Sequence, residues 1–386
     1  MFRQYRIQNY SFILMAAVTA LSVIGIMVIG SAQSSSQVRQ IAGLGIGLFM
    51  MVLLSLIDYS TLLRFRWIFY LAGCGLLTAV LIPGVGVQAG GATRWINIGV
   101  QFQPSDLMKL ILILFFSGFF QRFDSSLNKL QTILTCLFLV GIPLALIYKE
   151  PDLSTAIVTA LVFCAIIFAA GLSIRLILGV LAISIPGAAI FLSIVLRPDQ
   201  KLIDTYQRNR IMAWLRPAEY SETAYQQTNS IIAIGSGQLY GKGLNNNAIN
   251  SVKNGNFIAE PQTDFIFAVA GEELGFAGCI AIVLLELFIA LMCIRIGRRA
   301  KDKSGMLICT GVASLILFQS FVNVSVATGL MPNTGITLPF VSYGVTSLVT
   351  FCMQIGIVLN VGLQPKRTYQ IPRRSVTIPV EEKVSA

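Results

Sequence analysis

The sequence contains no histidine, and only 12% of its 386 residues are charged. Imidazole is the usual proton-transfer group near neutral pH, so its absence excludes Ser–His and Cys–His catalytic pairs and histidine metal ligands. Soluble domains are about 25% charged. The low charged fraction, together with 55% hydrophobic residues, therefore excludes a soluble enzyme and predicts a membrane protein whose chemistry uses other groups.

Disulfide patterns are also missing, although the chain has 7 cysteines. All of them lie within apolar runs and none forms a CxxC pair, so they are interpreted as small buried hydrophobic residues. The net charge of +11 does not indicate nucleic-acid binding, because in a chain of apolar spans it reflects basic loops on the cytoplasmic side. The first apolar run has no A-x-A cleavage site and is expected to be the first span.

Ten apolar stretches reach or approach the length of about 20 residues that a helix needs to cross a bilayer. They are continuous rather than alternating, which favours helices over strands. Their cores are residues 11–31, 41–57, 67–83, 106–121, 130–148, 153–171, 175–196, 265–294, 305–329 and 339–362. We therefore expect an all-α fold, a polytopic membrane protein with about ten transmembrane helices. Residues 1–364 are expected to form a single transmembrane domain, and residues 365–386 a basic cytoplasmic tail.

Lys and Arg residues set the expected orientation of these spans. The predicted inner segments hold 17 of them, whereas the short outer loops hold only Arg39, Arg94 and Lys149. Since basic residues favour the cytoplasmic side, both termini are predicted to be cytoplasmic. Residues 197–263 then form a large extracytoplasmic loop between helices 7 and 8, because long loops are translocated largely regardless of charge.

Polar residues next to the apolar spans gather on the predicted outer side, where each is expensive to place. They form four clusters, which are Gly91–Trp95 with Gln103–Lys109, Lys149–Asp152, Glu260–Asp264 and Pro332–Gly344. Structural roles remain open for single members. Asp106 and Lys109 can form a local ion pair, Trp95 can anchor at the interface, and Asp152 can cap the following span. Glu286 lies deep in the eighth span, where a structural hydrogen bond is the leading interpretation.

The long loop is expected to contain two short amphipathic helices, near Ile211–Leu215 and Tyr225–Ile234. The glycine-rich segment Gly235–Gly243 that follows is not a nucleotide-binding loop, because its glycine spacing is wrong and a glycine follows Lys242. Its backbone amides and the Lys242 charge can instead bind a pyrophosphate, and a plain turn is an equally good interpretation.

Asp264 is the leading candidate for a general base. It precedes the apolar run Phe265–Ala270, so its carboxylate is predicted at the outer membrane boundary. Burial would raise its pKa toward a value useful for accepting a proton, whereas nearby Arg or Lys residues would lower it. A capping role at the start of the eighth span is the alternative.

These clusters together resemble the SEDS (shape, elongation, division and sporulation) family of membrane glycosyltransferases, typified by RodA and FtsW. The resemblance runs over nearly the whole chain. It is carried by Gly91–Trp95 with Gln103–Lys109, Glu150–Ala156, Arg210–Ile211 with Tyr225–Ser230, Ala233–Gly243, Thr263–Gly275 and Thr334–Gly344. Gln262 stands where the family usually has histidine, and further departures are Asp106, Asn229, Ala259 and Val345. An active copy would therefore not need imidazole beside Asp264.

The resemblance implies a peptidoglycan glycosyltransferase that polymerises lipid II into glycan strands at the outer face of the bacterial cytoplasmic membrane. Asp264 would be the general base for the acceptor hydroxyl, with inversion at the donor and undecaprenyl pyrophosphate as the leaving group. The implied substrate-binding residues are Arg94, Trp95, Lys109, Asp152, Arg210, Lys242, Glu260 and Ser342. No metal ligands are assigned and no cofactor is certain, although a divalent cation at the pyrophosphate is left open. The implied partner is a class B penicillin-binding protein, a transpeptidase.

Two other functions remain open at this stage. A lipid II flippase also needs many spans with polar residues, but transporters place substrate groups near the midplane and show inverted repeats, and here the charges gather on one side. The replaced histidine at Gln262 also leaves open an inactive scaffold for a transpeptidase. The short termini favour a RodA-like role, and elongation, division and sporulation are not distinguished.

Overall fold

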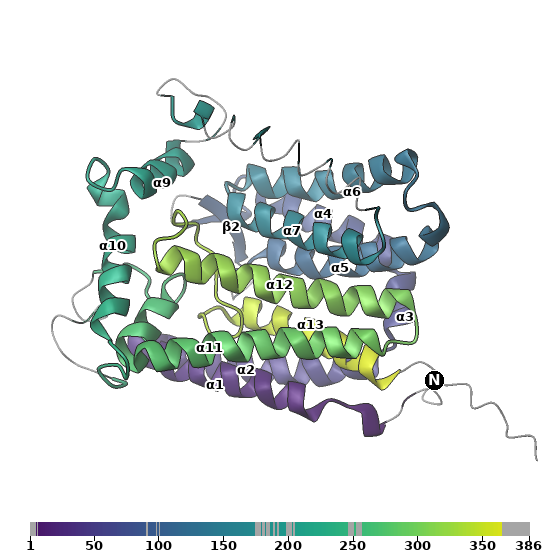
Figure 1. The fold of residues 1–386 in the computed structure, drawn as a ribbon, viewed down its shortest axis with the longest axis horizontal. Coiled ribbons are helices and arrows are strands. Elements are labelled where there is room, and N and C mark those ends of the chain that lie inside the picture. Colours follow the sequence, from purple (N-terminus) through teal and green to yellow (C-terminus); the bar gives the residue numbers. More distant parts are fainter. Residues whose placement is uncertain are drawn as a thin grey trace, which may run out of the picture.

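A computed structural model of the chain shows a bundle of long helices (Figure 1). It describes residues 5, 7–89, 92–97, 99, 101–173, 179, 182, 186, 187, 190, 193–197, 203, 205–245, 251 and 257–364. Two shorter helices, α9 (Thr205–Leu215) and α10 (Ser221–Ser236), lie at one end of the molecule, and the N-terminus lies at the other. The functional residues discussed below belong mainly to the end that carries α9 and α10.

Within the described residues, 7 helices are long and apolar enough to cross a membrane. They are α1 (Phe12–Ala32), α2 (Ser34–Leu56), α5 (Pro104–Arg122), α6 (Leu130–Lys149), α11 (Ile266–Arg298), α12 (Lys303–Ala327) and α13 (Val345–Leu363). Two shorter apolar helices are α4 (Arg66–Val80) and α7 (Leu153–Ala169). These nine helices correspond to nine of the predicted spans and confirm a polytopic helical membrane protein.

Two parts of the prediction cannot be compared with the structure. The predicted span at 175–196 lies largely outside the described residues, as does the whole predicted tail at 365–386. The last span differs from its prediction, because α13 begins at Val345 and not at Pro339. Its first predicted residues form a turn instead, and this turn contributes to the candidate site.

Polar side chains begin several helices by binding backbone N–H groups that have no partner inside the helix. Ser11 accepts from the N–H of Leu14 at the start of α1. Asp302 accepts from the N–H of Gly305 at 2.8 Å and begins α12. A short helix that the apolar pattern did not predict, α3 (Tyr59–Arg64), begins in the same way at Asp58.

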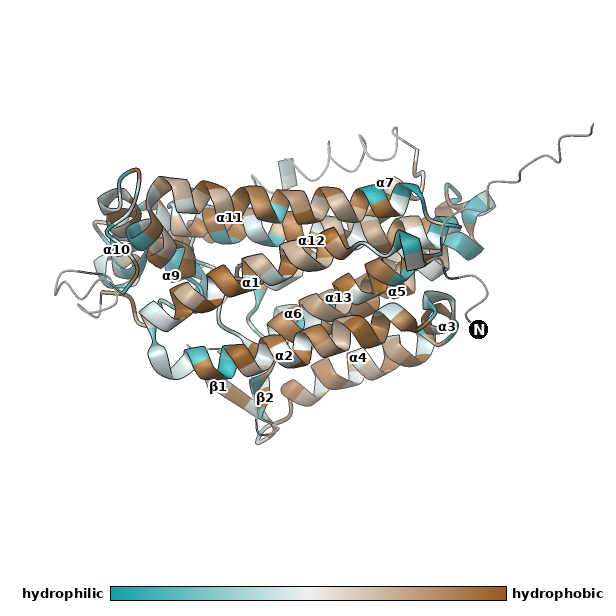
Figure 2. Ribbon diagram, turned by 90° about the horizontal axis from the view of Figure 1, so that it is seen from below, coloured by the Kyte–Doolittle hydropathy of each residue, from teal (hydrophilic) through white to brown (hydrophobic). Residues whose placement is uncertain are grey.

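The bundle is built around α12, which packs along α11 and against α5 and α7, while α2 packs along α13. At Gly356 of α13, an added Cβ would lie 2.5 Å from the carbonyl oxygen of Met51 in α2, so the close approach of these helices requires glycine. Aromatic rings join α5 to α7, where the Phe116 and Phe163 centroids are 4.7 Å apart. Figure 2 shows apolar residues along the helices and hydrophilic residues gathered at both ends of the bundle.

A small antiparallel sheet interrupts the expected all-α fold. Its strands are β1 (Gly86–Ala89), β2 (Ala92–Asn97) and β3 (Gln101–Phe102), in the order β1-β2-β3. Continuous apolar runs could not reveal such short strands, because they contain few residues and lie in a predicted loop. The pairing of β1 with β2 is irregular between Val87 and Gln88, which pair with Trp95 and Thr93, so Arg94 lies at a bulge and has no partner on β1. Arg94 is buried, whereas Trp95 is partly exposed.

The two loop helices confirm the predicted pair and dock on the end of α12. A helix leaves its last carbonyl groups without internal partners, and here side chains of α10 bind them. The Gln227 amide donates to the carbonyl oxygens of Val326 at 2.8 Å and Met331 at 2.7 Å, and Ser230 donates to that of Ala327 at 2.7 Å. The loop is therefore fixed to the bundle, and α9 is held beside the turn that follows α12.

Candidate functional site

Asp264 lies directly before α11, in a segment that is tied to the turn between α12 and α13. The Asn323 amide donates to the carbonyl oxygen of Asp264 at 2.9 Å and to that of Ile336 at 2.6 Å. The hydroxyl of Ser342 donates to the carbonyl oxygen of Thr263 at 2.7 Å. The acceptors in the Asp264 segment are main-chain oxygens, so these bonds fix its backbone. The fixed backbone in turn positions the Asp264 carboxylate.

Three charged groups converge at Gly335. A Cβ added to this glycine would lie 3.2 Å from Oδ2 of Asp264, 3.6 Å from Nη1 of Arg94 and 3.7 Å from Nη1 of Arg210. The three side chains come from the segment before α11, from β2 and from α9, which are far apart in the sequence. Gly335 has φ of 71°, a conformation that favours glycine, and it leaves open the space these groups surround.

Each arginine is held by a main-chain oxygen as well. Nη2 of Arg94 donates to the carbonyl oxygen of Pro151 at 2.6 Å, and its Nε lies 3.8 Å from Oδ2 of Asp152. Nη1 of Arg210 donates to the carbonyl oxygen of Asn333 at 3.3 Å. Both guanidinium groups are thus oriented before any ligand arrives, which lowers the entropy cost of binding an anion.

The charges around Asp264 set its proton affinity. Burial raises its pKa above the ordinary value, whereas Arg210 and Arg94 lower it and the negative charges of Asp152 and Glu260 raise it again. The residue remains partly exposed. A carboxylate of raised pKa beside fixed cations is suited to accepting a proton near neutral pH.

Several buried polar atoms around this space have no hydrogen-bond partner within the described residues. They are Nε of Arg94, both carboxylate oxygens of Glu150, Oδ1 of Asn333 and Oγ1 of Thr334. Buried polar groups are nearly always paired, so such a concentration indicates a site that binds a polar ligand or ordered water. Sequence reasoning assigned no role to Glu150, Asn333 or Gly335. The Glu150–Pro151–Asp152 motif could have pointed to the first of them.

Asp152 combines the predicted capping role with a position beside Arg94. Its Oδ1 accepts from the N–H of Thr155 at 3.1 Å and begins α7, and its Oδ2 accepts from the Gln103 amide at 3.2 Å. Because it is 1% exposed and close to Arg94, its carboxylate helps to orient that guanidinium group. Contact with substrate by Asp152 stays a prediction.

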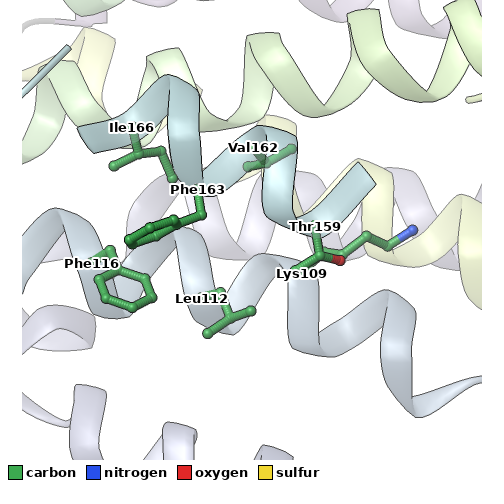
Figure 3. A pocket seen from close by; sticks show the side chains of 7 residues that line it. All are labelled: Lys109, Leu112, Phe116, Thr159, Val162, Phe163 and Ile166. Carbon is green, nitrogen blue, oxygen red and sulfur yellow. The ribbon is translucent and has the colours of Figure 1, made fainter. Parts of the chain in front are cut away.

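Lys109 is buried and already bound by two protein groups. Its Nζ lies 2.7 Å from Oδ1 of Asp106, the predicted local ion pair, and donates to Oε1 of Gln319 at 2.9 Å. Gln319 in turn donates to the carbonyl oxygen of Thr337, so Lys109 joins α5 to α12 and the following turn. Figure 3 shows Lys109 at one end of a small apolar pocket, with its Nζ directed away from Phe116 and Phe163.

Glu260, Gln262 and Ser342 form a hydrogen-bonded frame next to Asp264. The Gln262 amide donates to Oε2 of Glu260, and the Gln262 carbonyl oxygen accepts from the N–H of Tyr343 at 2.8 Å. The Ser342 hydroxyl also accepts from the N–H of Leu338 at 2.7 Å. Gln262 therefore has a structural partner, and substrate binding by Glu260 and Ser342 stays a prediction.

The glycine-rich segment contacts α11 near its kink at Gly275, where φ is 67°. The backbone N–H of Lys242 donates to the carbonyl oxygen of Glu272 at 2.9 Å, and its Nζ lies 2.8 Å from Oε1 of the same residue. An added Cβ at Gly241 would lie 2.1 Å from the carbonyl oxygen of Glu273. The glycines here permit close contact with a helix, and a pyrophosphate role for Lys242 stays a prediction.

The predicted site residues therefore fall into three groups. The structure brings Asp264, Arg94 and Arg210 around one space, with Asp152 behind Arg94 and Glu260 close enough to affect Asp264. Lys109 and Ser342 support the surrounding backbone. Trp95 is partly exposed on β2, and Lys242 contacts the α11 kink. In the part of the chain that the structure describes, no three Cys, Asp or Glu side chains gather as metal ligands.

A family model described as "Cell cycle protein", which covers FtsW, RodA and SpoVE, matches residues 5–367. The probable peptidoglycan glycosyltransferase FtsW of Geobacter sulfurreducens is 32% identical over 376 residues, 93% of this chain and 97% of the relative. The stage V sporulation protein E of Bacillus subtilis is 36% identical over 326 residues, 84% of this chain and 86% of the relative.

Two solved structures are similar over most of the chain. One is a chain of a peptidoglycan synthase complex that coordinates polymerization and crosslinking, with a TM-score of 0.74, 27% identity, and coverage of 92% of this chain and 97% of that chain. The other is the rod shape determining protein RodA of Thermus thermophilus, with a TM-score of 0.67, 27% identity, and coverage of 92% and 96%.

Proposed function

Because the chain belongs to the FtsW, RodA and SpoVE family, it is a peptidoglycan glycosyltransferase, and we propose that it polymerises lipid II with Asp264 as the general base. The observation that carries this proposal is the meeting of Asp264, Arg94 and Arg210 around Gly335. One carboxylate and two fixed cations are the groups that such a transfer needs. The proposal therefore assigns a role to each of the three side chains.

In the proposed reaction, the carboxylate of Asp264 takes the proton of the acceptor sugar hydroxyl. The oxygen attacks the anomeric carbon of the lipid-linked donor, the new glycosidic bond forms with inversion, and the bond to the pyrophosphate oxygen breaks. Undecaprenyl pyrophosphate leaves with the bonding electron pair. General-base assistance of this kind typically contributes about 10²–10⁴-fold to the rate.

Arg94 and Arg210 are the proposed stabilisers of the pyrophosphate. Guanidinium groups bind phosphate oxygens in bidentate fashion and keep their charge when buried. Since both arginines are already held by main-chain oxygens, they can meet the developing negative charge without reorganisation. Glu150, Asn333 and Thr334 would then bind sugar hydroxyl or amide groups with their unpaired polar atoms.

A divalent cation at the pyrophosphate stays a proposal. Mg²⁺ is usually held by one or two carboxylates together with substrate phosphates, and Asp264 and Glu260 could supply those carboxylates. Such an ion would neutralise part of the pyrophosphate charge. The two arginines already supply positive charge to the same space, so the reaction above assigns no step to a metal.

The proposed location is the bacterial cytoplasmic membrane, with both termini in the cytoplasm and the α9–α10 loop outside. The distribution of basic residues supports this orientation. The site then faces the side on which lipid-linked glycan units are joined. A class B penicillin-binding protein is the proposed partner, supported by the similarity to a synthase complex that coordinates polymerization and crosslinking.

Polymerisation is tested with purified protein and labelled lipid II, with and without a transpeptidase partner. Asp264→Asn should abolish glycan chains while the protein still folds, because the amide cannot take the hydroxyl proton. Glu219→Gln is the matched control, since Glu219 is an exposed carboxylate of the same loop, paired with Arg216. Undiminished polymer from Asp264→Asn would remove this residue from the mechanism.

The same preparation separates the remaining functions. Movement of lipid II across vesicles without polymer would favour a flippase, and Glu286, a buried carboxylate within α11, would then be its first candidate residue. Neither movement nor polymer, with retained binding of the transpeptidase, would favour the scaffold.

A further inference from the structure

A second cavity lies at the opposite end of the bundle from Asp264, between α4, α5 and α6. Its volume is about 520 Å³. Arg66 and Trp67 line it from α4, Phe119 and Arg122 from α5, and Lys129 with the first turns of α6 from the third side. The last turn of α5, which lines the cavity, lies near α3 and toward the N-terminus in Figure 1. This cavity contributes nothing to the proposed glycosyl transfer.

The cavity is cationic and has no matching negative charge. Arg66, Arg122 and Lys129 line it, and none of the described residues that line it is acidic. The nearest acidic residue in the sequence, Asp124, forms an ion pair with Lys303 on another helix. Positive charges confined together repel one another, so an anion in this cavity would be stabilised by all three.

Two of these cations are in unfavourable surroundings without a ligand. Nη1 of Arg66 donates to the carbonyl oxygen of Leu63 at 3.0 Å, but its buried Nε has no hydrogen-bond partner within the described residues. Lys129 occupies the N-cap position of α6 and makes no capping bond. A cation at a helix N-terminus opposes the helix dipole, whereas an anion there is favourable and can accept from the unpaired N–H groups.

Apolar side chains continue from the cavity along the outer faces of the same helices. The exposed fractions are 44% for Trp67, 62% for Ile68 and 65% for Leu71 on α4. On α6 they are 56% for Leu134 and 69% for Phe138. A ligand with a charged head and apolar chains would therefore contact both the cations and these faces, whereas free phosphate would contact the cations alone.

We propose that this cavity binds the phosphate headgroup of an anionic phospholipid, whose acyl chains lie along α4 and α6. Basic pockets between transmembrane helices at the cytoplasmic side are suited to such headgroups. The assignment to the inner leaflet rests on the proposed orientation of the termini. Headgroup binding itself does not depend on the proposed glycosyl transfer, and the test below measures no activity.

The test uses the full-length protein in bilayers that contain phosphatidylcholine and phosphatidylglycerol, followed by native mass spectrometry of the lipids that stay bound. We expect phosphatidylglycerol to be retained preferentially. The amount of phosphatidylglycerol that stays bound to the double variant Arg122→Gln/Lys129→Gln should be at least about tenfold lower, because each basic residue contributes to anionic lipid binding. Arg298→Gln/Arg299→Gln is the matched control, since both arginines are exposed near the end of α11 and do not line the cavity.

A third variant guards against loss of folding. Arg122→Lys/Lys129→Arg keeps both charges and should retain phosphatidylglycerol as the unchanged protein does. Equal retention of the two phospholipids, or full retention by the charge-removing variant, would overturn the proposal. Displacement of the lipid by inorganic phosphate, or preference for undecaprenyl pyrophosphate over phosphatidylglycerol, would overturn the assignment to a phospholipid.

Discussion

Gly335 is the residue around which the proposed catalytic groups are arranged, and it has no side chain of its own. Sequence patterns identified Asp264 and Arg94 because these polar residues lie beside apolar spans, and the family resemblance added Arg210. They could not identify Gly335, because the value of a glycine here is the empty volume between three side chains. That volume exists only after residues from β2, from α9 and from the segment before α11 have been brought together.

Gly335→Ala is expected to abolish polymer formation. The added methyl group would lie 3.2 Å from Asp264 Oδ2, and the φ of 71° strains any residue with a side chain. Polymer yield from labelled lipid II is the measurement. Gly84→Ala is the control, because Gly84 has a φ of 89° and an added Cβ there would meet nothing within 4 Å. Equal losses from both variants would show that strain, and not the filled space, causes the effect.

Glu150 should make the stability of the protein depend on pH. Burial and the negative charge of Asp152 raise its pKa from 4.5 to about 8, against the opposing effect of Arg94. The folded protein therefore keeps this carboxyl protonated at neutral pH, whereas the unfolded chain ionises it. Stability should thus be greatest below the unfolded pKa and should fall as pH rises toward about 8.

Glu150→Gln should remove this dependence, because the amide does not titrate. The measurement is the thermal unfolding temperature in detergent across the range from acid to mildly alkaline pH. The difference between the two proteins at the ends of that range should be on the order of a few kcal/mol. Glu219→Gln is the control and should keep the slope of the unchanged protein, as Glu219 is exposed. Parallel slopes for Glu150→Gln and the unchanged protein would contradict the prediction.

At the scale of helices and strands, an element could be predicted when its apolar run was long and was missed when the run was short. The spans from α1 to α13 could be predicted because each run is long, continuous and too apolar for water. The strands of residues 86–102 could not, because they are short and are stabilised by pairing with one another. The start of α13 was also missed, since residues 339–344 are apolar in sequence but form part of the turn beside Asp264.

The attachment of α10 to α12 should contribute directly to stability. Gln227→Ala removes the donor to the carbonyl oxygen of Met331 and one of two donors to that of Val326, which keeps the N–H of Gly329. A buried unpaired polar group costs about 1–3 kcal/mol. We expect a lower unfolding temperature and weaker lipid II use, because α9 carries Arg210. Thr228→Ala, on the exposed side of the same helix, should change neither. An unchanged unfolding temperature for Gln227→Ala would mean that the loop is not held by these bonds.

For the whole molecule, the sequence indicated which residues lie near the site but not which protein groups their side chains contact. The side of the membrane on which these residues gather stays a prediction from the distribution of Lys and Arg residues. Whether Lys109 and Lys242 face a ligand or another protein group could not be inferred, because ion pairs such as Lys242–Glu272 join residues far apart in the chain. Such ion pairs depend on how the helices are placed relative to one another, which a local sequence pattern does not predict.

The proposed orientation can be measured with a membrane-impermeant maleimide on intact spheroplasts. Cysteine placed at Thr228, on the exposed face of α10, should react from outside. Cysteine placed at Arg299, after α11, should react only once the membrane is permeabilised. The native cysteines lie in apolar helices, away from a polar reagent, so the unchanged protein serves as the control. The reverse pattern would invert the proposed topology.

The amide of Asn323 holds two carbonyl oxygens at once, that of Asp264 and that of Ile336, from a position inside α12. Asn323 thereby binds both the segment of the proposed base, Asp264, and the turn that contains Gly335 to the same helix. If a partner or a bound lipid slides α12 along its axis, both would travel together and keep their spacing. Arg94 belongs to β2 and would not move with α12. Such a shift would therefore change the distance between Asp264 and Arg94, whereas the distance between Asp264 and Gly335 would stay the same.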